Sequence, residues 1–256
     1  MSVPALFQWT SASRSDVGLV RERNEDAVLD QPERGLWVVA DGMGGHAVGD
    51  FASQTVVSAL NSLPPPRSLP DYIAGARQQL LEANRLIQAE AVRRRVQRIG
   101  STVVVLLAHD QHCACLWAGD SRIYLYRDGH LHQLTRDHSV AEEMRSRRGA
   151  AAGNSTSHVA RNAITRAVGA APSLEIDEEL VEVHDGDVFL LCSDGLSNLL
   201  SADEIANALA HGNRRDAADA LVNLALAHGG RDNVSAVVAC AEDLYNSDKT
   251  LLNPAL

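Results

Sequence analysis

Short and almost uninterrupted apolar runs recur along the chain, and polar or glycine-containing turns separate them. The run Leu36–Ala40 contains no polar residue, which is typical of a strand that is buried on both faces. Apolar runs this short, rich in β-branched and aromatic residues, favour strand over helix. On this basis we expect strands at 36–40 and from about Asp26 onward, and further strands at 7–14, 103–108, 113–118, 123–126, 174–183, 187–193 and 233–240.

Two stretches place apolar residues three or four positions apart, as one face of a helix requires. The first covers residues 48–62, and the prolines at 64–66 and Pro70 prevent it from continuing and predict a rigid surface loop. The second covers residues 73–91 and ends in the arginines 93–95. Shorter helices are predicted at 138–148, 202–211 and 214–228.

The order of these elements predicts the fold class. Strands come from both ends of the chain, and the two longer helices lie between them. This order lacks the regular strand–helix alternation of a parallel sheet, so it favours an α+β fold with mostly antiparallel sheets. No proline- or glycine-rich linker divides the 256 residues, of which 45% are apolar. We therefore expect a single domain at 1–243, followed by a polar tail at 244–256.

Composition and charge exclude some classes of function. The formal net charge of −10 argues against a general surface for nucleic acid or anionic membranes. The chain opens without a basic and apolar leader, and no apolar run approaches the ~18 residues of a membrane span, so we expect a cytoplasmic protein. The cysteines lie in strand-like runs without C-x-x-C spacing, which predicts buried free thiols and no zinc site. They are Cys113, Cys115, Cys192 and Cys240.

Acidic residues stand at the ends of four predicted strands. Asp41, Asp120 and Asp194 each follow an apolar run, and Asp232 stands just before the last one. Carboxylates without nearby cysteine or histidine ligands suit hard cations such as Mg²⁺ or Mn²⁺. Two such ions about 3.5–4 Å apart can position a hydroxide for attack on a phosphoryl group. Aspartate also favours turns for structural reasons, so each acid alone is compatible with either role, whereas the joint pattern favours a metal site.

A second group of polar residues precedes the strand at Asp26. Glu25 and Asp26 are further oxygen ligands, and Arg21 lies four residues before Glu25. A guanidinium offers phosphate oxygens a planar, bidentate fork that lysine cannot reproduce. Arg23 is an equally good candidate, and spacing alone does not distinguish the two arginines.

The sequence resembles a known family, the metal-dependent type 2C Ser/Thr protein phosphatases, in their bacterial form. No single motif is specific, but eight of them occur in the family's order and span residues 15 to 235. The motifs are at 15–26, 39–46, 100–102, 118–122, 134–139, 162–169, 192–196 and 229–235. The resemblance implies an αββα sandwich, in which two stacked antiparallel sheets carry a helical pair on each outer face.

The resemblance also implies a binuclear Mn²⁺ or Mg²⁺ centre. By position, Asp41 bridges both ions, and Asp194 and Asp232 complete the first site. Glu25 and the carbonyl of Gly42 serve the second, partly through water. The mechanism implied is direct attack of a metal-bridged hydroxide on phosphoserine or phosphothreonine.

Three further roles follow from the same resemblance. Asp120, together with Asp194, corresponds to a third and weaker metal site of bacterial relatives. Asp26 corresponds to the residue that orients metal-bound water, and Arg21 to the residue that holds the substrate phosphate.

The chain departs from the family pattern beside the metal site. Met43 stands where animal members have a histidine that protonates the leaving alkoxide, and a thioether cannot do this. His46 is three residues away, and a helix-entry role competes with a catalytic one there. The general acid is therefore left open. The loop at 149–157 occupies the position of the family's flap, and its small polar residues indicate no substrate preference.

The lead hypothesis is a monomeric Ser/Thr protein phosphatase that opposes a bacterial Ser/Thr kinase and acts on phosphorylated Ser/Thr proteins. A pseudophosphatase that only binds phosphoproteins is the non-enzymatic alternative, and the retained acids disfavour it. A phosphohydrolase of the same fold, acting on a small molecule or on an anti-anti-sigma-type protein, is the third possibility.

Overall fold

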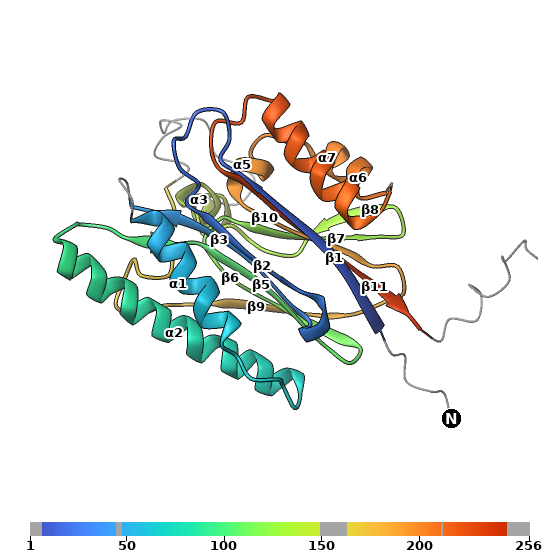
Figure 1. Cartoon of the computed structure of the whole chain (residues 1–256), viewed down its shortest axis with the longest axis horizontal. Coiled ribbons are helices and arrows are strands. Elements are labelled where there is room, and N and C mark those ends of the chain that lie inside the picture. Colours follow the sequence, from blue (N-terminus) through green and yellow to red (C-terminus); the bar gives the residue numbers. More distant parts are fainter. Residues whose placement is uncertain (1–6, 45–47, 149–162, 211, 245–256) are drawn as a thin grey trace, which may run out of the picture.

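Two antiparallel β-sheets stacked on each other form the centre of the molecule, and a pair of helices covers the outer face of each (Figure 1). The structure is a computed structural model, and it describes residues 7–44, 48–148, 163–210 and 212–244. The arrangement confirms the α+β class and the αββα sandwich that the family resemblance implied.

The first sheet has the strand order β2-β3-β5-β6-β9, and the short β4 pairs with β3. Every pairing in it is antiparallel. Its outer face packs against two long helices, α1 (Gly49–Asn61) and α2 (Leu69–Arg94). Its strands are β2 (Asp26–Gln31), β3 (Leu36–Met43), β4 (Gly100–Ser101), β5 (Val103–His109), β6 (His112–Ala118) and β9 (Asp177–Glu182).

The second sheet has the order β1-β11-β10-β7-β8 and joins the two ends of the chain, because β1 pairs with β11 along its whole length. Helices α6 (Ala202–Ala210) and α7 (Arg214–Ala227) cover its outer face. Its strands are β1 (Phe7–Asp16), β7 (Arg122–Arg127), β8 (His130–Gln133), β10 (Val188–Cys192) and β11 (Val234–Asp243). The short elements η1 (Pro32–Arg34), α3 (Val140–Arg148) and α5 (Asp194–Ser197) lie outside the sheets.

The first five residues of β3, Leu36–Ala40, are all apolar because the strand is buried on both faces there. Leu36, Val38 and Ala40 pack towards α1 and α2, whereas Trp37 and Val39 pack between the two sheets. All five side chains are fully buried. A strand that is buried on both faces has no position for a polar side chain until it reaches the edge of the core.

The structure adds the short elements η1, β4 and α5, which were not predicted, and it differs from the sequence prediction in α2, β8 and β9. Pro70 lies in the first turn of α2, where its missing N–H is not needed, and Ser68 accepts a hydrogen bond from the Asp71 N–H as the helix cap. The loop predicted through Pro70 therefore ends two residues earlier. Strand β8 was missed because it is short and largely exposed, and the strand predicted from residue 174 begins only at Asp177.

Several predictions concern residues outside the described ranges. The loop at 149–157, His46 and all of the tail 244–256 except Leu244 lie there. Within the described ranges, all four cysteines are free and buried, as expected. None of the described helices combines the length and apolarity needed to cross a membrane.

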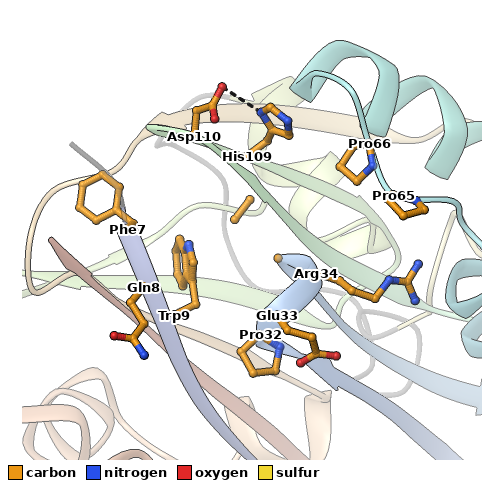
Figure 2. Close-up of a pocket in the computed structure, with 12 residues that line it drawn as sticks. Phe7, Gln8, Trp9, Pro32, Glu33, Arg34, Pro65, Pro66, His109 and Asp110 are labelled. Carbon is orange, nitrogen blue, oxygen red and sulfur yellow. Dashed lines mark ion pairs between the residues drawn. The ribbon is translucent and has the colours of Figure 1, made fainter. Parts of the chain in front are cut away.

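A groove of about 660 Å³ opens at the end of the sandwich where β3 begins. Trp9, Pro32, Arg34 and Pro66 are among its walls, and Figure 2 shows lining side chains from β1 and from the β2–β3 connection. None of the acids predicted to bind metal lines it. Those acids lie at the other end of β3.

Candidate metal centre

The topology brings the predicted acids to one end of the sandwich. Asp41 lies near the end of β3, and Asp120 follows β6, whose end is next to the start of β5. Asp194 follows β10, and Asp232 precedes the start of β11, which is the antiparallel neighbour of β10. Antiparallel pairing places the end of one strand beside the start of the next within each sheet, and the hydrogen bond from Ser193 Oγ to Asp26 Oδ2 joins the two sheets here. The four acids from distant parts of the sequence therefore share one edge of the sandwich.

Asp26 and Asp41 form a cross-strand pair at this edge. Their Cα atoms are directly opposite in the register of β2 and β3. Asp26 is buried, and its Oδ2 accepts hydrogen bonds from Ser193 Oγ at 2.8 Å and Ser235 Oγ at 2.6 Å. Its Oδ1 is buried and has no hydrogen-bond partner in the structure. Asp26 is thus held on one side and free to accept on the other.

The backbone around Asp41 is fixed by Thr102. The Asp41 N–H donates to Thr102 Oγ1 at 3.2 Å, and the Thr102 N–H donates to the Asp41 carbonyl at 2.8 Å. Gly119, which precedes Asp120, has φ +119° and lies so close to Thr102 that a Cβ would come within 2.6 Å of its side chain. Glycine is required there because the conformation and the contact both exclude a side chain.

Glu25 and Gly42 meet at a gap that only glycine leaves open. A Cβ added to Gly49 would lie 2.8 Å from both the Glu25 Oε1 and the Gly42 carbonyl oxygen. These two oxygens therefore flank the same small space at the start of α1. The Gly42 N–H donates to the Glu25 carbonyl at 3.1 Å, which ties the two segments together.

The acids strongly perturb one another. Burial, followed by the charges of Asp26, Asp194, Asp120 and Asp232, raises the pKa of Asp41 well above its ordinary value. Burial raises the pKa of Asp26 to about 7, against the hydrogen bonds from Ser235 and Ser193, and the charges of Asp194 and Asp232 add to the rise.

Asp120 and Asp194 respond in the same way. Burial and the charge of Asp194 raise the pKa of Asp120 to about 7. Burial and the charge of Asp232 raise the pKa of Asp194, although a hydrogen bond with Asp41 opposes the rise. Without a compensating cation, this edge of the molecule favours protonated carboxyl groups.

The cluster fits a hard divalent cation in ligand type and in charge. All of its donors are carboxylate or carbonyl oxygens, and two buried carboxylate oxygens, Asp26 Oδ1 and Asp120 Oδ1, have no hydrogen-bond partner. Among the described residues, however, no three Asp, Glu, His or Cys side chains are arranged to hold one metal ion. The donors are gathered at one edge without forming a closed coordination sphere.

Arg21 lies at the rim of the cluster. Its Nη2 forms an ion pair with Asp232 Oδ2 at 2.8 Å, and the side chain of Arg21 is 53% exposed. The hydrogen bond and charge of Asp232 raise the pKa of the Arg21 guanidinium, and Glu25 and Asp41 add smaller contributions. Arg23 is exposed, and only its carbonyl takes part in a described contact near the site. The geometry therefore favours Arg21 over Arg23 as the arginine of the site.

Met43 lies beside the cluster without a polar role. It is half-buried, and its Cε lies 3.1 Å from where a Cβ of Gly100 would be. It packs at the β3–β4 pair, so the position of the proton donor expected in animal relatives holds an apolar group.

Asn233 was not predicted as a site residue, but its side chain holds the backbone around Arg21 and Glu25 in place. Its Nδ2 donates to the carbonyls of Val17 and Arg23, both at 2.9 Å, and its Oδ1 accepts from the Glu25 N–H at 2.8 Å. One buried amide thus holds both ends of the loop that carries Arg21, and also Glu25. Its place directly after Asp232 is the signal that could have indicated this role.

Replacing Asn233 with alanine is expected to destabilise the fold by about 2–5 kcal/mol, because three part-buried hydrogen bonds to backbone groups are lost together. Urea unfolding measures this loss. Asn223→Ala, at an exposed position of α7, is the control and should change stability by less than about 0.5 kcal/mol. Equal stabilities of the two variants would contradict this role of Asn233.

Comparison with known proteins supplies independent findings. The family model described as Protein phosphatase 2C matches residues 7–234. The chain is 37% identical to the serine/threonine protein phosphatase PstP of Mycobacterium tuberculosis over 247 residues, which are 96% of this chain and 48% of PstP. The chain therefore spans about half the length of that relative.

Two solved structures resemble the fold closely. One is PppA, a key regulatory component of T6SS in Pseudomonas aeruginosa, which is 44% identical with a TM-score of 0.85 over 91% of this chain and 97% of PppA. The other is the catalytic domain of PstP in complex with two manganese ions. It is 36% identical with a TM-score of 0.83 over 93% of this chain and 100% of that domain.

Proposed function

Because this chain belongs to the protein phosphatase 2C family, we propose that it is a metal-dependent phosphatase of phosphoserine and phosphothreonine in proteins. The observation that carries the proposal is the edge of buried and half-buried, mutually repelling carboxylates with one arginine at its rim. Such a cluster needs cations to balance its charge, and the exposed guanidinium beside it can bind an anion such as phosphate.

The residues that would hold two Mn²⁺ or Mg²⁺ ions are those the resemblance assigned. Asp41, Asp194 and Asp232 supply carboxylates, and Glu25 with the Gly42 carbonyl supplies the oxygens around the gap at Gly49. The PstP catalytic domain with two manganese ions supports this number of ions.

A third, weaker site would use Asp120 with Asp194. Its support in this chain is the buried, unpartnered Asp120 Oδ1 and the charge of Asp194, which together with burial raises the pKa of Asp120.

Divalent cations, when bound here, lower the pKa of water and neutralise charge on the phosphoryl oxygens. The chain itself orients the reactants. Arg21 binds the phosphate of the substrate through its exposed fork. Asp26 accepts a hydrogen bond from the attacking water on Oδ1, because Ser193 and Ser235 occupy Oδ2. Met43 supplies no proton to the leaving alkoxide, so the alkoxide leaves without a dedicated side-chain acid at that position.

The partners that follow from this chemistry are phosphorylated Ser/Thr proteins, and the reaction opposes that of a Ser/Thr kinase. Phosphate release from a phosphothreonine peptide is the direct test, in Mn²⁺ and in excess chelator. Release in Mn²⁺ that stops in chelator supports the proposal, and release that persists in chelator overturns the metal-dependent mechanism. Binding of the peptide without release would indicate a phosphoprotein-binding protein.

Arg21→Ala is expected to lower kcat/KM for the phosphopeptide about 10- to 100-fold, the value of one or two charge-assisted hydrogen bonds. Arg21→Lys should recover only part of this, because an ammonium lacks the planar fork. Neither variant should weaken Mn²⁺ binding in calorimetry, since the Arg21–Asp232 ion pair competes with a cation for the same carboxylate. Arg67→Ala, at an exposed position in the loop before α2, is the control. Weaker Mn²⁺ binding by Arg21→Ala would place Arg21 in a different role.

A further inference from the structure

Two large apolar side chains are exposed directly before Arg21. Leu19 and Val20 each expose 67% of their surface in the connection between β1 and β2. Other large apolar side chains are exposed singly, but among the described residues these are the only two that are neighbours in sequence. Single exposed apolar residues are ordinary, whereas adjacent ones next to a functional group suggest a contact surface.

The backbone holds this pair outward. The Leu19 N–H donates to the Gly230 carbonyl at 2.7 Å, and Asn233 binds the carbonyls of Val17 and Arg23 on either side of the loop. Gly18 has φ +79°, and a Cβ there would lie 2.2 Å from the Asp232 carbonyl oxygen. The loop is therefore packed against the segment that carries Asp232. These contacts prevent Leu19 and Val20 from folding back into the core.

The same loop presents positive charge beside the apolar pair. Arg21 and Arg23 are exposed on it, Arg231 is exposed on the neighbouring segment, and Glu22 is the one acid between the two loop arginines. A ligand that satisfies this surface must combine an anionic group with an adjacent apolar group. A phosphorylated peptide with an apolar residue near its phosphorylated side chain has this combination.

We propose that Leu19 and Val20 bind the apolar residue that flanks the phosphorylated side chain of the substrate, and so select apolar-flanked phosphopeptides. This inference rests on the proposed phosphatase function. Consecutive Cα atoms are about 3.8 Å apart, so a peptide whose phosphate reaches Arg21 passes its next one or two residues over Val20 and Leu19. Burial of the exposed apolar surface then favours the complex.

The test compares phosphothreonine peptides that carry leucine, in turn, at the two positions before and the two positions after the phosphothreonine, with an all-serine reference. In Mn²⁺ the unmodified protein should prefer at least one leucine peptide about tenfold in kcat/KM, the scale of a modest apolar contact. The double variant Leu19→Ser/Val20→Ser should lose this preference through a higher KM with kcat little changed. Hydrolysis of p-nitrophenyl phosphate, which has no flanking residues, should be unaffected.

The matched control is Leu86→Ser/Val92→Ser, which removes two exposed apolar side chains from α2 and should retain the preference. Retention of the preference by Leu19→Ser/Val20→Ser, or equal rates on all peptides by the unmodified protein, would overturn the inference. An equal fall in p-nitrophenyl phosphate hydrolysis would also overturn it, because the loop would then act on the metal centre. Failure of the unmodified protein to release phosphate from any peptide would instead contradict the proposed function.

Discussion

Asp41→Asn is expected to lower phosphate release from a phosphothreonine peptide more than 100-fold, since even residues that only support metal ligands are worth about 10- to 100-fold. Asp41 is the residue on which the charges of Asp26, Asp194, Asp120 and Asp232 all act, so it lies at the electrostatic centre of the cluster. A carboxamide occupies nearly the same volume but cannot balance a divalent cation. Calorimetry with Mn²⁺ should show a parallel loss of binding.

The same substitution should stabilise the protein in chelator, which separates a metal ligand from an ordinary structural acid. At neutral pH, folding must either bury the Asp41 carboxylate beside other acids or protonate it, and asparagine avoids both costs. The melting temperature in chelator should therefore rise, at about 2–4 °C for each kcal/mol gained.

The control for this result is Asp71→Asn, at an exposed position in the first turn of α2, which should leave activity and Mn²⁺ binding unchanged. A destabilised Asp41→Asn protein in chelator, or one that still binds Mn²⁺ normally, would contradict the assignment of Asp41 as a shared ligand.

Much of the fold could be predicted because its strands are buried on both faces. The run Leu36–Ala40 is apolar throughout for this reason, and the strand there is confirmed. The two long helices are also confirmed, since their apolar periodicity reflects one buried face. Strand β8 could not be predicted, because a largely exposed edge strand of four residues carries no apolar pattern. Pro70 was misplaced because proline ends one helix and begins another equally well.

The candidate site also has parts that could be predicted from the sequence and parts that could not. Acids at strand ends could be located from the sequence, and antiparallel pairing does bring them to one edge, although their roles as ligands stay predictions. The hydrogen bonds by which Asn233 holds the Arg21 loop could not be predicted, since they join residues more than 200 positions apart. Likewise the two serines that hold Asp26 come from β11 and from the residue after β10, and no local pattern marks them.

In chelator, the free energy of unfolding is expected to fall as pH rises from about 5 to 8. The pKa values of Asp26 and Asp120 are raised from 3.8 to about 7 in the folded protein. Between these limits the folded state binds protons that the unfolded chain has lost, so stability decreases with rising pH, by at most about 1.4 kcal/mol per pH unit for each group. Asp41 and Asp194, whose pKa values are also raised, act in the same direction.

His138 opposes this trend, because burial lowers its pKa and its neutral form gains stability as pH rises. Because one group opposes four carboxyl groups, the free energy of unfolding still decreases with rising pH.

Saturating Mn²⁺ should remove this dependence on pH and add about 2.7 kcal/mol at a hundredfold excess over Kd, since the cation takes the place of the bound protons. Urea unfolding at several pH values, with chelator and with Mn²⁺, measures both effects. The double variant Asp26→Asn/Asp120→Asn should flatten the slope in chelator, and stability that rises with pH in the unmodified, chelated protein would show that these acids are not the groups that Mn²⁺ neutralises.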